Sequence, residues 1–293
     1  MHGWIILDKP LGLSSAQGVA AVKRILRTNG YPVPKIGHGG TLDPLATGVL
    51  PIALGEATKL SGRMLDSDKG YRFTIAFGSA TATDDAEGAV VATSDVRPDR
   101  AAIDAALPAF TAPIRQRPPA YSALKVDGER AYKLARAGET VELAEREVTI
   151  RALTVVAHDR DHLTLDVACT KGTYVRSLAR DLAQALGTVG HVSMLRRTLA
   201  GPFGLDQANP LDKVEALGQE RALEQALLPL TAGLDDIPVL PVDPAEAAQL
   251  RQGQRLGGRP DTSGLHLATA GSVPVALVEV SADGVQVVRG FNL

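Results

Sequence analysis

The chain has little cysteine, few aromatic residues and no long apolar segment. Its only cysteine is Cys169, which excludes an internal disulfide framework and is typical of a reducing compartment. Aromatic residues make up 4% of the sequence, and no run approaches the roughly 18 apolar residues of a membrane span. The apolar stretch before Asp8 and Lys9 is too short for a signal peptide. We therefore expect a cytoplasmic protein that does not enter a membrane.

The sequence patterns of metal and cofactor sites are missing as well. The six histidines are scattered, and His158 and His162 lie in a predicted hairpin, where residues four apart do not converge as they do on a helix. The chain has neither the Gly-Lys-Ser/Thr end of a phosphate-binding loop nor a Gly-x-Ser-x-Gly elbow. We expect its chemistry to run without a metal or a cofactor.

What is present is the composition of a globular protein, with 45% hydrophobic and 22% charged residues among 293. Residues 16–27 and 172–187 carry apolar side chains at helical spacing, whereas residues 71–77 alternate as in a strand. Strand and helix patterns follow one another without the regular alternation of a doubly wound sheet. This order predicts the α+β class.

A domain boundary is predicted near residues 237–244. Asp243, Pro244 and Glu246 supply an N-cap, a proline in the first turn and an acid at N3, and Gly253 ends the helix that they begin. The sequence after this helix is typical of a β-hairpin. We therefore expect one domain over residues 1–236 and a small β-rich domain over residues 237–293.

Charge is grouped along the chain although the formal net charge is only −2. Residues 1–75, 111–136 and 171–200 each carry a net charge of +4, and acidic segments separate them. If these basic blocks converge in space, they form a local positive surface that attracts a polyanion. Charge alone favours the simpler interpretation, in which the blocks are solvated faces.

One carboxylate has unusual surroundings. Asp43 lies in GHGGTLDPLATGVLPI (37–52), a segment with four glycines and two prolines. Pro44 keeps Asp43 out of the helical conformation, and the glycines permit close approach of a ligand or another backbone. A carboxylate on such a rigid loop can act as a nucleophile or base. An Asx-turn is the commoner explanation of an Asp-Pro pair, and an aspartyl-phosphate nucleophile would need Mg²⁺ and further acids.

Arg176 and Arg180 share one face of the predicted 172–187 helix, opposite its leucines. A cation near the start of a helix is poorly placed in the field of the helix dipole. A carboxylate from another segment or a phosphate would hold it there. A solvated polar face is the alternative.

Six motifs together resemble the TruB family of tRNA pseudouridine synthases, and specifically its stand-alone bacterial branch. They occur in the family's order over about two thirds of the chain, and they are LDKPLGLSS (7–15), GHGGTLDPLATGVLPIALGEATK (37–59), DKGYRF (68–73), YSALKVDG (121–128), KGTYVRSL (171–178) and GHVSMLRR (190–197). The resemblance implies isomerisation of the T-loop uridine of tRNA to pseudouridine, without a cofactor.

The resemblance also implies an architecture and a partner. It predicts a pseudouridine synthase core around a bent, mostly antiparallel sheet flanked by helices, with a thumb over about residues 107–145. A PUA-like RNA-binding domain would follow from residue 237. A monomer that binds the T-arm stem-loop of tRNA is expected.

In this resemblance Asp43 corresponds to the catalytic aspartate. Attack on C6 of uracil, attack on C1′ of ribose and glycal formation all stay open as its chemistry. Arg176 corresponds to the partner that keeps this carboxylate charged and oriented. Tyr71 corresponds to the active-site tyrosine, whose ring can stack on the extruded base and whose hydroxyl can mediate proton transfer.

Five further residues are predicted to contact the substrate or to support the site. The resemblance implies that His38 fills the gap left by the flipped nucleotide, and that Tyr174 and Leu195 line the uracil pocket. Lys9 is expected to support the core through the Lys-Pro turn, and Lys59 to reach phosphate. A non-catalytic protein that binds or folds tRNA with the same basic surface is the alternative function.

Overall fold

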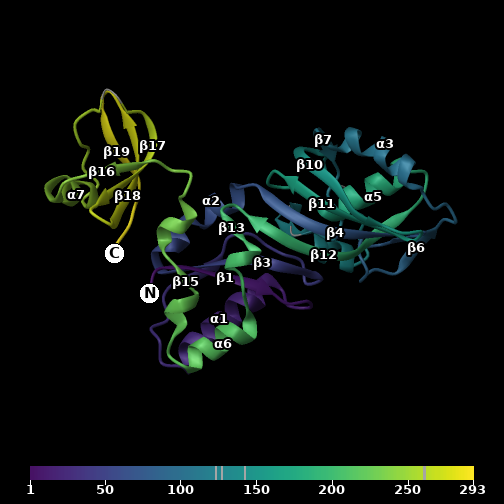
Figure 1. Ribbon diagram of the computed structural model, residues 1–293, viewed down its shortest axis with the longest axis horizontal. Coiled ribbons are helices and arrows are strands. Elements are labelled where there is room, and N and C mark those ends of the chain that lie inside the picture. Colours follow the sequence, from purple (N-terminus) through teal and green to yellow (C-terminus); the bar gives the residue numbers. More distant parts are fainter. Residues whose placement is uncertain (123, 127, 142, 260–261) are drawn as a thin grey trace.

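The computed structural model describes residues 1–122, 124–126, 128–141, 143–259 and 262–293. Within these ranges eleven strands form one long sheet, and four others form a small sheet at the C-terminal end (Figure 1). Most neighbouring strands of the long sheet are antiparallel, and helices pack on its face. The α+β class predicted from the sequence is confirmed.

The strands of the long sheet are β1 (Gly3–Lys9), β2 (Ile36–His38), β3 (Ala46–Leu54), β4 (Lys69–Phe77), β7 (Pro113–Gln116), β10 (Arg146–His158), β11 (His162–Cys169), β12 (Gly190–Ala200), β13 (Phe203–Gly204), β14 (Asn209–Pro210) and β15 (Leu227–Leu228). The α-helices are α1 (Ser15–Thr28), α2 (Ser61–Asp66), α3 (Arg100–Phe110), α4 (Ala131–Arg136), α5 (Val175–Ala185), α6 (Leu211–Gln219) and α7 (Pro244–Arg251). Short 3₁₀ helices are η1 (Gly55–Leu60), η2 (Leu205–Gln207), η3 (Leu223–Ala226) and η4 (Leu230–Gly233).

The remaining strands form three smaller sheets. Two hairpins pair β5 (Ser79–Thr81) with β6 (Val90–Thr93), and β8 (Lys125–Val126) with β9 (Glu129–Arg130). The C-terminal sheet has the order β16 (Val239–Pro241), β17 (Gly264–Ala270), β18 (Val273–Ser281) and β19 (Gly284–Gly290).

The long sheet follows the order β14-β1-β3-β12-β4-β11-β10-β7. Strand β12 runs parallel to β3 and antiparallel to β4, so it joins the N-terminal strands to the middle of the sheet. Register shifts interrupt the pairing of β12 with β4 and of β10 with β11, as β-bulges do. This order places the ends of β3, β4 and β12, which are far apart in sequence, beside one another.

Strands β1 and β3 are buried on both faces. In β1, Ile5 and Leu7 pack into one apolar cluster, whereas Trp4 and Ile6 pack into a second cluster on the opposite face. The first cluster includes residues of α1, α3, α5 and α6, and the second includes residues of η1, η4 and the C-terminal sheet. Burial on two faces explains why the sequence of β1 is continuously apolar rather than alternating.

The two helices predicted from periodicity are present. Helix α1 begins after Ser14, whose side chain caps it together with Gln17, and it buries Val22, Ile25 and Leu26. Helix α5 buries Leu178 and Leu182 against the sheet. Both helices bury one apolar face and leave the other polar, as their sequences predict.

The C-terminal sheet is fixed to the rest of the chain. It has an apolar cluster of its own, but Leu267, Leu277 and Phe291 belong to the same buried cluster as Trp4 and Leu60. Polar contacts support this packing: Lys59 Nζ donates to the carbonyl of Gly290 at 2.9 Å, and the backbone N–H of Asn292 donates to Glu56 at 2.8 Å. A β-rich C-terminal sheet is therefore observed, while the boundary at residues 236 and 237 and the PUA-like character stay predictions.

The connection between β7 and β10 covers residues 117–145, and β8, β9 and α4 are its described elements. The predicted thumb began at about residue 107, but residues 107–110 belong to α3 and residues 113–116 to β7.

Among the helices of the described residues, none combines the length and the apolar character that a membrane span requires.

Candidate active site

The loop that carries Asp43 lies between β2 and β3 and is tied down on both sides of the carboxylate. Before Asp43, the hydroxyl of Ser15 accepts from the N–H of Leu42 at 2.7 Å and donates to the carbonyl of Leu42 at 3.1 Å. After Asp43, the carbonyl of Pro44 accepts from the N–H of Gly12 at 2.8 Å. A loop held at both neighbouring residues presents its carboxylate in a fixed direction.

Two glycines of this segment are required by close approach. A Cβ on Gly39 would lie 2.6 Å from Cβ of Met64. A Cβ on Gly48 would lie 2.2 Å from the carbonyl oxygen of Arg197, and Gly48 also has a φ of +99°. The glycine-rich sequence around Asp43 therefore lets the loop pack against α2 and β12.

Arg176 binds Asp43. Its Nη2 lies 2.8 Å from Oδ2 of Asp43, in an ion pair whose arginine side chain is 6% exposed and whose aspartate side chain is 40% exposed. Arg176 stands in the first turn of α5, where the helix dipole disfavours a cation, and the carboxylate compensates for that position. The exposed oxygen atoms of Asp43 remain accessible from solvent.

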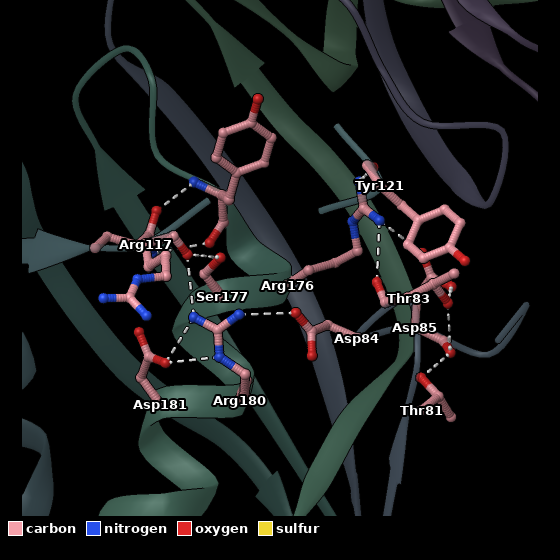
Figure 2. Close-up of polar contacts among 12 residues, drawn as sticks. Thr81, Thr83, Asp84, Asp85, Arg117, Tyr121, Arg176, Ser177, Arg180 and Asp181 are labelled. Carbon is pink, nitrogen blue, oxygen red and sulfur yellow. Dashed lines mark hydrogen bonds and ion pairs between the residues drawn. The ribbon is translucent and has the colours of Figure 1, made fainter. Parts of the chain in front are cut away.

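The same guanidinium holds two further segments (Figure 2). Its Nη1 donates to the carbonyl of Thr83 at 3.0 Å and to the carboxylate of Asp85 at 3.2 Å. Its Nη2 donates to the carbonyl of Tyr121 at 3.1 Å. Arg176 thus joins the Asp43 loop, the 83–85 turn and the start of the 117–145 connection, and we call these groups the Arg176 cluster.

Asp85 is a fixed, buried member of this cluster. Its side chain is 8% exposed, and it accepts from the N–H of Glu87 at 3.0 Å and from the hydroxyl of Thr83. Two carboxylates therefore share one guanidinium, but they differ in access to solvent. Asp85 is fully engaged by the protein, whereas the side chain of Asp43 has no hydrogen-bond or ion-pair partner besides Arg176 in the described part of the chain.

Arg180, one turn further along α5, repeats this arrangement with the neighbouring acid. It binds Asp84 at 2.9 Å and Asp181, and it donates to the carbonyl of Arg117 at 3.1 Å (Figure 2). Burial raises the pKa of Asp84, and Arg180 opposes that effect. Asp84 has a φ of +60°, an uncommon left-handed conformation for a residue other than glycine. In this turn Asp84 binds Arg180, and Asp85 binds Arg176 one helical turn earlier.

Tyr71 and Arg197 form a second polar pair beside the loop. Tyr71 lies on β4, and burial raises the pKa of its hydroxyl, while the nearby charge of Arg197 opposes the shift. Arg197 is 1% exposed and donates to the carbonyls of Val49 at 2.7 Å, Gly40 at 3.2 Å and Thr41 at 3.3 Å. Arg197 therefore fixes the Asp43 loop and places its charge near the tyrosine.

These groups surround a cavity of about 330 Å³, a size that suits a small ligand. Its lining includes Asp43, Tyr71, Tyr174, Arg176 and Leu195. A second cavity of about 740 Å³ shares Asp43 and Arg176 with the first, and His38 and Tyr121 also line it. The Asp43–Arg176 pair thus belongs to the walls of both cavities.

Comparison with known proteins identifies this arrangement. Residues 23–175 match the family model described as TruB family pseudouridylate synthase, N-terminal domain. Residues 176–235 match the model described as tRNA pseudouridylate synthase B C-terminal domain. The chain belongs to the TruB family of pseudouridylate synthases. It is therefore an enzyme, which decides against the non-catalytic and aspartyl-phosphate alternatives.

Two relatives match this chain over its full length. It is 62% identical to tRNA pseudouridine synthase B of Novosphingobium aromaticivorans, over 100% of this chain and 98% of that protein. It is 54% identical to the protein of the same name from Zymomonas mobilis, over 100% of this chain and 96% of that one. The resemblance predicted from the six motifs is confirmed.

Solved structures share the fold of this TruB chain. A chain in the structure of an H/ACA RNP bound to a substrate RNA containing 2′-deoxyuridine has a TM-score of 0.76 and 24% identity, over 99% of this chain and 85% of that one. A chain of the archaeal box H/ACA sRNP Nop10–Cbf5 complex gives a TM-score of 0.74, also at 24% identity, over 99% of this chain and 86% of that one. At this identity the likeness concerns the fold alone.

The structure brings most of the predicted site residues of the TruB chain together. Asp43, Tyr71, Arg176, Tyr174 and Leu195 line the smaller cavity. His38 lines the larger one, where burial lowers the pKa of its imidazole; its Nδ1 is buried and has no hydrogen-bond partner among the described residues. Their roles in catalysis and substrate binding stay predictions.

The two predicted lysines lie outside the smaller cavity. Lys9 is fully buried, and its Nζ donates to the carbonyls of Leu13 at 2.5 Å and Pro44 at 3.3 Å, so it supports the Asp43 loop. Burial lowers the pKa of Lys9 to about 8. Lys59 lies against Glu56 and Gly290 at the C-terminal sheet, because η1 packs on that side. Neither lysine lines the smaller cavity.

Sequence reasoning missed Asp85 and Arg197. The adjacent acids at 84 and 85 and the arginines at 176 and 180 were visible in the sequence, but their pairing depends on contacts between distant segments. Arg197 donates to backbone carbonyls, and such partners cannot be identified from the order of side chains in the sequence. Among the described residues, no group of three or more histidine, cysteine or acidic side chains is placed to hold a metal ion.

Proposed function

We propose that this enzyme isomerises the T-loop uridine of tRNA to pseudouridine, with Asp43 as the reacting carboxylate. The observation that carries the proposal is the partly exposed Asp43, held 2.8 Å from Arg176 at the wall of a 330 Å³ cavity. The adjacent guanidinium orients the carboxylate by a directed, charge-assisted hydrogen bond. The route through C6, C1′ or a glycal stays open.

The chemistry needs an enclosed space. The C1′–N1 bond of uridine breaks and a C1′–C5 bond forms, so the detached base must turn and remain beside the ribose. C5 loses a proton to solvent and N1 gains one, which leaves the atoms of the nucleotide unchanged. Tyr71 and Leu195 supply a ring and an apolar side chain against which a flat base can turn.

Tyr71 is placed to assist the proton transfers. Because burial raises its pKa, its hydroxyl is protonated at neutral pH and can donate a hydrogen bond. Arg197 stabilises the phenolate that would form if this proton were passed on. We propose that Tyr71 relays the proton that leaves C5.

Recognition of RNA is supported by the positions of basic residues. Residues from all three basic blocks line the two cavities: Lys69 comes from the first block, Arg130 and Arg136 from the second, and Lys171 and Arg197 from the third. Lys69 and Arg197 are buried and donate to backbone carbonyls, so contacts with phosphate would fall to the other three. The target base must leave its stack at a cost of a few kcal/mol, and contacts from cations to phosphate offset this cost. We propose that His38 occupies the position that the base vacates.

The proposal extends to the whole chain. Residues 1–236 would carry catalysis, and residues 237–293 would form a PUA-like RNA-binding domain. We propose that the enzyme works in the cytoplasm as a monomer that binds the T-arm stem-loop of tRNA. Unstacked bases in a loop are the usual target of sequence-specific RNA recognition.

The test is release of tritium from tRNA that contains 5-³H-uridine. Wild-type enzyme should release one tritium per tRNA, and a tRNA with a substituted T-loop uridine should release none. Asp43→Asn keeps the shape of the side chain and one acceptor oxygen but removes its charge. We expect it to form no pseudouridine while its tRNA affinity stays within about twofold of wild type, because the lost charge acts on the reacting atoms. Full turnover by this variant would refute the role of Asp43.

A further inference from the structure

A pair of residues at the base of the thumb holds Tyr174. Gln116 on β7 and Arg146 on β10 face each other across the two antiparallel strands, directly before and after the 117–145 connection. The side chain of Gln116 is fully buried, accepts from the N–H of Tyr174 at 2.7 Å and donates to its carbonyl at 3.0 Å. The backbone of Tyr174 is thus fixed by one amide side chain from the strand beside it.

Arg146 fixes the side chain of Tyr174, whereas Gln116 fixes its backbone. Its guanidinium carbon lies 4.6 Å from the centroid of the Tyr174 ring, within the range of a cation–π contact. Its Nη2 also donates to the carbonyl of Gly172, in the turn that leads to Tyr174. Within the described part of the chain no carboxylate lies within ion-pairing distance of Arg146, so the ring is its principal partner.

The position of Tyr174 connects this contact to the reaction. Tyr174 and Arg146 both line the 330 Å³ cavity that also contains Asp43. Tyr174 is the N-cap residue of α5, so it is separated from Arg176 by only one residue. A shift of Tyr174 would therefore move a wall of the cavity and the start of the helix that presents Arg176.

We propose that Arg146, together with Gln116, is a positioning residue for pseudouridine formation. It holds the Tyr174 ring as the wall against which the detached uracil turns. The inference rests on the proposed function, because that function assigns the smaller cavity to uracil. A misplaced wall leaves RNA binding intact and slows the step in which the base must meet C1′ in a defined orientation.

One feature distinguishes Arg146 from a merely structural arginine. Its Nε is buried and has no hydrogen-bond partner among the described residues. Leaving a charged donor unpaired is costly, so a position with only a packing role would favour an apolar side chain of the same length. The contact with the Tyr174 ring accounts for a charged side chain at position 146.

The first experiment compares Arg146→Met with wild type in single-turnover reactions on tRNA. Methionine keeps an unbranched apolar stem but removes the cation. We expect the rate of pseudouridine formation to fall about tenfold, with the dissociation constant for tRNA within about twofold of wild type. Arg151→Met is the matched control, because Arg151 lies on the same strand and forms an exposed ion pair with Asp68; its rate should equal that of wild type.

A double-mutant cycle tests whether Arg146 acts through the ring. In a Tyr174→Phe background, which keeps the ring, Arg146→Met should again lower the rate about tenfold. In a Tyr174→Ala background it should lower the rate less than about twofold. An equal loss in the alanine background would overturn the proposal, as would a loss of tRNA affinity in place of rate, which would identify a direct phosphate contact.

A second variant keeps the proposal testable if Arg146→Met does not fold, as judged by thermal unfolding. Arg146→Lys retains a cation that can lie over the ring, and we expect a loss of only about threefold. A lysine variant that loses about tenfold or more would contradict the ring contact. Wild-type enzyme that forms no pseudouridine at all would instead refute the proposed function, so the two failures are distinguishable.

Discussion

At the scale of single residues, solvent access separates two carboxylates that share one cation. Asp43 and Asp85 both bind Arg176, but their side chains are 40% and 8% exposed. The acceptor positions of Asp85 are engaged by Thr83, Glu87 and Arg176, so it can only orient the guanidinium. Asp43 keeps accessible oxygen atoms and lines both cavities. The environment, rather than the residue type, makes Asp43 the reactive candidate.

The sequence predicted Asp43 and Arg176 through the resemblance of their motifs to a known family, because the local patterns alone allowed an Asx-turn and a solvated helix face. It could not predict Gln116 or Arg146 as partners of Tyr174, because those contacts require β7 and β10 to pair and then to meet the turn before α5. The position of Lys59 was unpredictable for a related reason. A lysine in a motif is compatible with phosphate binding, and only the tertiary structure places it beside Gly290 of the C-terminal sheet.

The buried amine of Lys9 predicts a pH effect on stability. Burial lowers its pKa in the folded protein from 10.5 to about 8, so between these values the unfolded chain binds more protons than the folded chain. The contribution of Lys9 to stability should therefore rise as pH increases from 8 to 10. We expect the difference in unfolding free energy between wild type and Lys9→Met to grow by on the order of 1 kcal/mol over this range.

Urea denaturation at several pH values measures this difference. Comparison with the variant removes the contributions of other groups that titrate in the same range. A difference that stays constant, or that falls as pH rises, would show that Lys9 does not lose its proton more easily in the folded protein.

At the scale of secondary-structure elements, the sequence predicted helices α1 and α5 but not the contacts that fix them to other segments. The apolar face and N-cap of α1 are encoded within residues 14–28, and the buried stripe of α5 is equally local. The bond between Ser15 and Leu42 joins the start of α1 to the Asp43 loop, and nothing in either segment alone indicates it. In the sequence Ser15 looks like part of a helix cap, although the side chain that caps α1 is that of Ser14.

Adjacent serines allow a matched test of this attachment. Ser15→Ala removes both hydrogen bonds to the backbone of Leu42, so we expect the rate of pseudouridine formation to fall about tenfold, because the Asp43 loop loses its tie. Ser14→Ala should lower stability by about 1 kcal/mol through the lost cap and leave the rate unchanged. Single-turnover kinetics and thermal unfolding of both variants provide the measurements. Equal rates for the two variants would contradict the role assigned to Ser15.

At the scale of the whole molecule, the C-terminal sheet shares a core with the long sheet. The sequence indicated a boundary from the helix start at Asp243, but it gave no sign of the packing of Leu267, Leu277 and Phe291 beside Trp4. Segments of this kind fold together when the cluster that joins them is buried and apolar. We therefore expect one cooperative unfolding transition.

The only tryptophan reports on this shared cluster. Trp4 is fully buried, and its ring centroid lies 5.4 Å from that of Phe203. Urea transitions followed by Trp4 fluorescence and by far-ultraviolet circular dichroism should coincide in wild type. Phe291→Ala should lower the unfolding free energy by about 3–5 kcal/mol, because it leaves a cavity in the cluster. Separate transitions in wild type would show that the C-terminal sheet unfolds independently.

The Arg176 cluster also sets an order of events during synthesis of the chain. Asp43, Asp85 and the carbonyl of Tyr121 all precede Arg176, so they leave the ribosome before the cation that gathers them. Until α5 emerges, the Asp43 loop and the 83–85 turn lack the guanidinium that joins them in the folded protein. A nascent chain released before α5 is made would therefore carry Asp43 without the cation that fixes its direction.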